Sequence, residues 1–130
     1  MGLQEKQAWA AVNPQIKESQ ETLAEAAGAP IAIVIEEPSF GTKDLIEYIP
    51  TAVLGHLAAG FADLCSDSLA KEAVQTSVKR VMVANKATDQ FAMKLDDCTL
   101  HVEGNFDPNG MSGLQYPHAN DYKKFLTENL

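Results

Sequence analysis

Two segments in the second half of the chain alternate between apolar and polar residues. Residues 91–95 and 98–103 have apolar side chains at every second position, namely Phe91, Met93, Leu95, Cys98, Leu100 and Val102. A period of two predicts strands with one face on the core and the other towards solvent. Asp96-Asp97 lies between the two runs and suits a tight hairpin.

A third segment, Val78–Ala84, differs because its centre, Val81 to Val83, has no polar break. An unbroken apolar run is typical of a strand inside a sheet or covered on both faces. A polar connection, Asn85–Asp89, separates it from the two alternating runs. Together the three segments predict an antiparallel meander over residues 78–106.

A fourth strand is predicted at Ile31–Ile35, where three isoleucines and a valine occupy four of the five positions. It ends at Glu36-Glu37-Pro38, because proline cannot donate to a strand ladder. The residues between this strand and Val78 have helical patterns. A crossover of that length can make strands 31–35 and 78–84 parallel neighbours.

The rest of the chain is predicted to be helical. Asn13-Pro14 suits a helix start, so two helices are expected within Leu3–Ala27, with Gly28 as the final cap. Further helices are expected from Thr42, from Pro50, after Asp67, and from Pro117 or Asn120. The prediction is one α+β domain over 1–130, in the order α-α-β-α-α-β-β-β-α, with a four-stranded and mostly antiparallel sheet packed by helices.

The predicted helix Pro50–Ser66 is apolar or small nearly all round. Its broad apolar face is formed by Val53, Leu54, Leu57, Phe61 and Leu64, and its small face by Ala52, Gly55, Ala59 and Ala62. Such a helix is usually buried, so we expect it between the sheet and a second helix from this chain or a twin. His56 and Asp63 interrupt it on one side.

Composition narrows the classes of function. The chain has 130 residues and a net charge of −8, which disfavours binding to nucleic acid or to anionic membranes. Cys65 and Cys98 form neither a disulfide framework nor a metal motif, so both are expected as buried thiols in a reducing compartment. No signal peptide or run of about 18 apolar residues is visible, and we expect a cytoplasmic protein without a cofactor.

The candidate site residues are few. His101 and Glu103 share the outer face of the last predicted strand and could do acid–base work if that face were covered. Glu36, Tyr116 and His118 are possible partners, and His56 could face a pocket. The glycine-rich turn at 104–113 lacks the spacing of a calcium or phosphate loop.

Two classes of function remain. The first is a small acidic binding or adaptor protein that acts through protein contacts as a homodimer, with the apolar strand 31–35 covered by edge pairing or helix packing between copies. The alternative is a small-ligand protein or enzyme that uses His101 and Glu103 in a polar cavity. No convergent catalytic set supports the enzyme.

Overall fold

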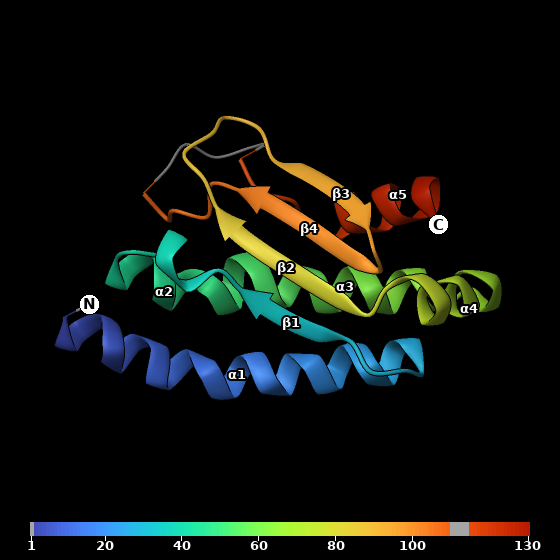
Figure 1. Cartoon of the computed structure of the whole chain (residues 1–130), viewed down its shortest axis with the longest axis horizontal. Coiled ribbons are helices and arrows are strands. Elements are labelled where there is room, and N and C mark those ends of the chain that lie inside the picture. The colour runs from blue at the N-terminus through green and yellow to red at the C-terminus, as the bar shows by residue number, and fades with distance from the viewer. Residues whose placement is uncertain (1, 110–114) are drawn as a thin grey trace.

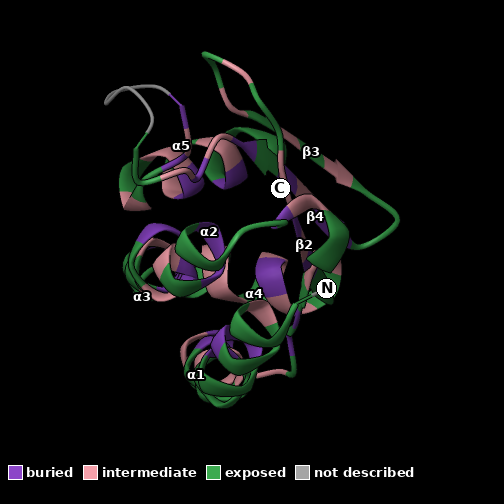
Figure 2. Cartoon of the chain, turned by 90° about the vertical axis from the view of Figure 1, so that its left-hand side faces the viewer, coloured by how far each residue is buried: buried purple, intermediate pink, exposed green. Residues whose placement is uncertain are grey.

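The computed structural model describes residues 2–109 and 115–130, which form a layer of sheet against a layer of helices (Figures 1 and 2). The helices are α1 (Leu3–Ala27), α2 (Lys43–Ile49), α3 (Gly55–Leu64), α4 (Ser68–Ser77) and α5 (Ala119–Asn129). The strands are β1 (Ala32–Ile35), β2 (Arg80–Asn85), β3 (Ala92–Asp96) and β4 (Thr99–Gly104). A 3₁₀ turn, η1 (Glu37–Ser39), follows β1, and a π-helical turn, η2 (Pro50–Leu54), joins α2 to α3.

The sheet has the order β1-β2-β4-β3, and the predicted meander is wrong. β2 pairs with β4 in parallel, not with β3, so the sheet is mixed and mostly parallel. The reason lies in burial. Leu100 and Val102 of β4 are fully buried and belong in the middle, whereas Met93 and Leu95 of β3 are half-buried and suit an edge. The parallel pairing of β1 with β2 is confirmed.

The predicted hairpin between β3 and β4 is confirmed, displaced by one residue. Asp96 pairs with Thr99, so the turn consists of Asp97 and Cys98. Their φ angles are 51° and 58°, the left-handed conformation that a two-residue primed turn requires. Cys98 is therefore exposed in the turn and not on the core face, although Cys65 is buried as expected.

The N-terminal segment is one helix, and the predicted break at Asn13-Pro14 is wrong. Asn13 and Pro14 are both exposed, so water can solvate the carbonyl that loses its hydrogen bond to proline. Trp9 and Leu23 are buried along the same helix, and their packing offsets that loss. Because the break is absent, the element order is α-β-α-β-β-β-α in outline.

Several predicted helix ends are confirmed. Gly28 has a φ of 74° and donates its N–H to the Ala24 carbonyl at 2.8 Å. The Thr42 hydroxyl accepts from the N–H of Leu45, and Asp67 caps α4 in the same way. Residues 110–113 of the predicted glycine-rich turn lie outside the described residues.

α2, η2 and α3 form one continuous helical stretch, Lys43–Leu64. It is buried between α1 and α5, which confirms the prediction of a second helix beside it. Most of the predicted small face is not buried, because Gly55, Ala59 and Ala62 are exposed, although Ala52 is buried. By length and composition alone this stretch could cross a membrane, but half of its apolar window is buried within the fold, as in a core helix.

The helices cover one face of the sheet and one of its edges. α1 runs beside β1, and the Gln20 side-chain carbonyl accepts the Ile33 N–H at 2.8 Å (Figure 1). This contact satisfies an edge donor that would otherwise be free to pair with another strand. The opposite sheet face has no helix over it in the described residues (Figure 2). We call this the open face, made of Ala32, Val34, Arg80, Met82, Ala84, Ala92, Lys94, Asp96, Thr99, His101 and Glu103.

Candidate functional site

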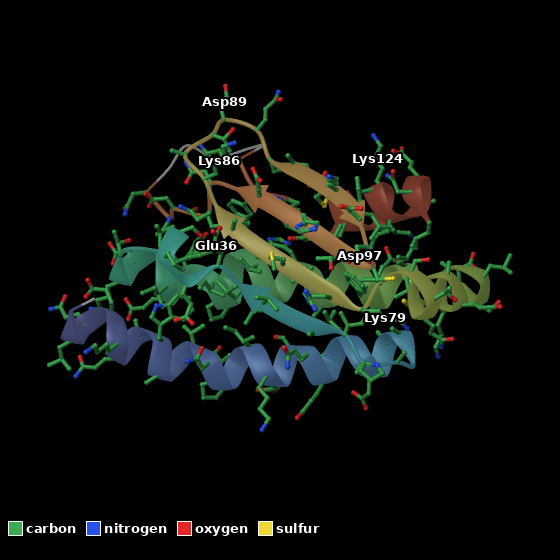
Figure 3. All side chains as sticks on the ribbon, in the orientation of Figure 1. Glu36, Lys79, Lys86, Asp89, Asp97 and Lys124 are labelled. Carbon is green, nitrogen blue, oxygen red and sulfur yellow. The ribbon has the colours of Figure 1, made fainter. Side chains whose placement is uncertain are left out.

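The carboxyl ends of the parallel strands β1, β2 and β4 lie side by side at one end of the sheet, which we call the carboxyl edge. Glu36 follows β1 and Lys86 follows β2 there, whereas Lys79 and Asp97 mark the other end of the strands (Figure 3). The Ser39 hydroxyl accepts the Asn85 N–H at 2.9 Å and ties η1 to β2. Ligands of open sheets with parallel strands bind outside this kind of edge.

A chain of aromatic rings begins at this edge and continues to the start of α5. Phe40 stacks on Phe106 with ring centroids 5.8 Å apart, and Phe106 lies 5.5 Å from Tyr116. Tyr116 stacks on His118 at 4.9 Å, and His118 meets His56 edge-on at 4.4 Å. We call Tyr116, His118 and His56 the His–Tyr cluster.

Two glycines allow the backbone to bring this cluster together. A Cβ at Gly104 of β4 would lie 2.8 Å from the Gln115 carbonyl and 3.1 Å from Tyr116. A Cβ at Gly60 of α3 would lie 2.8 Å from the Ala119 carbonyl at the start of α5. The two distances of 2.8 Å to carbonyl oxygens are shorter than real Cβ contacts. A larger residue at either glycine would therefore force the segments apart.

The cluster has perturbed acid–base properties. Burial lowers the pKa of His56, the neighbouring imidazole of His118 lowers it further, and the Asp121 carboxylate opposes both effects. Burial and the nearby Tyr48 hydroxyl raise the pKa of Tyr116. The Asp121 carboxylate accepts the His118 backbone N–H at 2.8 Å and holds the start of α5.

The chemistry available to the cluster is limited. A catalytic base needs a reacting atom within hydrogen-bond reach, but here Tyr116 packs on His118 and His118 packs on the edge of His56. Among residues 2–109 and 115–130, no group of three His, Cys, Asp or Glu side chains is placed to hold a metal ion. The arrangement suits a contact between α3 and α5 that weakens at acidic pH, because the lowered pKa of His56 keeps its imidazole neutral at pH 7.

The other candidates lie on the open face. His101 sits between Met82 and Lys94 in the sheet register, and Glu103 lies two residues further along β4. They line a shallow depression of about 420 Å³ over β3 and β4. The Glu103 carboxylate lies 3.6 Å from the Lys86 ammonium, and both side chains are exposed. The covered cavity that acid–base work would need is not formed by the described residues.

The structure therefore divides the predicted site residues into three places. It brings together His56 and Tyr116, together with His118, and it leaves His101 and Glu103 on the open face. Glu36 lies apart, exposed beyond β1. Tyr48 had no signal in the sequence, because it reaches Tyr116 only through the packing of α2 near the chain that leads into α5.

Comparison with protein-family models, curated proteins and solved structures finds no significant match to this chain. The functional inference rests on the geometry and chemistry of its own residues.

Proposed function

We propose that this chain is a small acidic cytoplasmic binding protein that acts through protein–protein contacts as a homodimer. The observation that carries the proposal is the open face. Three of the four strands pair in parallel, and parallel sheets are normally covered on both faces. In residues 2–109 and 115–130 the helices cover one face, so a second molecule is the natural cover for the other.

Two apolar side chains, Val34 and Met82, lie next to each other on the open face. Val34, Met82 and His101 are consecutive neighbours in one row across β1, β2 and β4. The side chain of Val34 is 38% exposed, and Met82 is half-buried. Protein interfaces combine apolar residues of this kind with polar ones around them.

Charge favours a second copy as the cover. The open face has two cations, Arg80 and Lys94, and two anions, Asp96 and Glu103, so its formal charge is zero against −8 for the chain. The negative charges of two copies repel each other over most of the surface, but the open face carries no net charge and adds no such repulsion. A two-fold axis through the face would allow the cations of one copy to approach the anions of the other.

The size of the face sets the expected strength. Four strands spaced about 4.8 Å apart and about five residues long cover roughly 19 by 17 Å. This is below the roughly 800 Å² per partner of a standard interface, so the dimer is expected to dissociate in the micromolar range or above.

Sedimentation velocity between about 5 and 500 μM tests the proposal. The wild-type chain is expected to shift from monomer to dimer over this range. Val34→Lys should remain monomeric, because association would bury the new charge against the apolar surface of the partner. Leu69→Lys is the matched control, because Leu69 is 77% exposed on α4 and away from the face. A wild-type monomer throughout, or a Val34→Lys variant that associates normally, would contradict the proposal.

A further inference from the structure

We propose that the free edge of β3 binds an extended, basic segment of a partner polypeptide as an additional antiparallel strand. β3 is the outermost strand of the order β1-β2-β4-β3, so it has a strand on one side only (Figure 1). The opposite edge of the sheet is occupied, because Gln20 of α1 accepts the N–H of Ile33. Within residues 2–109 and 115–130, no strand pairs with the outer side of β3. This edge is a second surface, and it does not rest on the proposed dimer through the open face.

The pairing of β4 shows which backbone groups the free edge presents. The Gly104 carbonyl accepts the Lys86 N–H at 2.8 Å, so the even-numbered residues of β4 face β2. The odd-numbered residues of β4 therefore face β3, where they pair with the even-numbered residues of β3. Because backbone groups alternate between the two sides of a strand, the N–H and carbonyl groups of Met93 and Leu95 point away from the sheet. No strand or turn of the described residues bonds to them.

An apolar groove runs beside this edge, between β3 and α5. It has a volume of about 230 Å³ and is lined by Phe91, Met93, Asp121, Lys124, Phe125 and Glu128. Phe91, Met93 and Phe125 are half-buried, so part of each side chain is available for contact. Directly opposite residues of an antiparallel pair share a face of the sheet. The residue opposite Met93 in an added strand would therefore place its side chain in the groove, while its backbone bonds to β3.

Charge favours a basic segment over a second copy of this chain. Four carboxylates and two ammonium groups surround the edge and the groove, which gives a formal charge of −2; they belong to Asp96, Asp97, Asp121, Glu128, Lys94 and Lys124. The whole chain has a charge of −8, so a second copy is repelled and a segment with lysine or arginine is attracted. A basic residue opposite Asp96 would form a cross-strand pair. The segment that fits has apolar residues at alternate positions and basic residues at its ends.

The peptide acetyl-Lys-Val-Thr-Val-Lys-amide is designed for this edge. In the antiparallel register its first lysine lies opposite Asp96, and its two valines lie opposite Leu95 and Met93. The valine N–H groups then point to β3, and the threonine N–H points to solvent. The peptide is titrated to about 5 mM into isotope-labelled protein, a range that covers weak peptide binding. We expect saturable shifts of the amide resonances of Met93 and Leu95.

N-methylation distinguishes strand addition from a general apolar contact. Methyl groups on the two valine nitrogens remove the donors to β3 and should weaken binding at least about tenfold. Methyl groups on the nitrogens of the threonine and the last lysine are the matched control, and they should change the affinity less than about threefold. Absence of saturable shifts at Met93 and Leu95, equal weakening by the two methylated peptides, or the reverse order overturns the assignment.

Variants of the peptide and of the protein test the groove and the charge. Glutamate in place of both lysines of the peptide should weaken binding at least about tenfold, and equal binding overturns the basic character of the partner. Phe125→Ala removes a wall of the groove and should weaken binding about three- to tenfold, with urea unfolding to show that the variant is folded. Leu69→Ala shortens an exposed apolar side chain on α4 and should leave the affinity unchanged. Val34→Lys should bind the peptide as the wild type does, so failure of the dimer and failure of this site are distinguishable.

Discussion

Replacing Tyr122 by phenylalanine should stabilise the protein. Tyr122 lies on α5, its side chain is fully buried, and its hydroxyl has no hydrogen-bond partner among the described residues. Burial, and to a smaller extent the charge of Asp121, raise the pKa of Tyr122, so the phenol stays neutral at any ordinary pH. The hydroxyl was removed from water on folding and received no partner in return.

The size of the gain follows from two opposing effects. A buried unsatisfied polar group costs about 1–3 kcal/mol, which the substitution recovers. The hydroxyl leaves a void of roughly 10 Å³, which costs about 0.2 kcal/mol at about 24 cal/mol per Å³. The free energy of unfolding should therefore rise by about 0.8–2.8 kcal/mol. For a chain of this size, each kcal/mol raises Tm by roughly 3–6 °C.

Urea unfolding followed by circular dichroism and by Trp9 fluorescence measures this change. The midpoint should rise while the slope against urea stays constant, because the surface exposed on unfolding is the same. Tyr116→Phe is the comparison, because the Tyr116 hydroxyl lies beside that of Tyr48 and is already partnered. Its removal should bring no gain and lower the free energy of unfolding by up to about 1 kcal/mol. A loss of stability in Tyr122→Phe would refute the reasoning and indicate an acceptor for the hydroxyl, such as a buried water.

Three further predictions concern the cluster, the hairpin and the helix contact. The pKa of His56 is lowered in the folded chain, so the unfolded chain takes up a proton first as the pH falls. The free energy of unfolding should therefore be highest above about pH 6.5 and decrease below it. Urea midpoints measured from pH 5 to 8 should depend less on pH in His56→Gln than in the wild type. Cys98→Gly should raise the free energy of unfolding by about 1 kcal/mol by relieving the left-handed turn, and a fall in thermal midpoint would contradict this. Gly60→Ala should lower the free energy of unfolding by about 1–3 kcal/mol, because the new Cβ would meet the Ala119 carbonyl. Gly55→Ala is the control, because its Cβ would lie 3.5 Å from the nearest atom, the Pro50 carbonyl oxygen. In the same urea assay it should be neutral or stabilising by up to about 1 kcal/mol.

The features that the sequence predicted correctly depend on residues close together in the chain. Gly28 ends α1 and Thr42 begins α2 because each makes its capping bond within four residues. The β3–β4 hairpin is equally local. Pro14 was misread because the local cost of proline inside a helix is outweighed by Trp9 and Leu23, which pack on other elements.

The strand order could not be predicted in the same way. β3 and β4 both alternate, and only the depth of the core distinguishes the central strand, with Val102 buried, from the edge strand, with Met93 half-buried. The site follows the same rule. His56 and Tyr116 were each candidates, but their meeting depends on how α3 packs against α5, at the close approach of Gly60.

The bond from the Gln20 side chain to Ile33 has a consequence for the growth of assemblies. A sheet with an unprotected edge can add copies without limit, as fibres do. Here α1 and Gln20 occupy the β1 edge, and the β3 edge is short, with exposed Lys94 and Asp96 beside it. The proposed association through the open face would use that face up in both partners, so the assembly would close at two copies and would not polymerise.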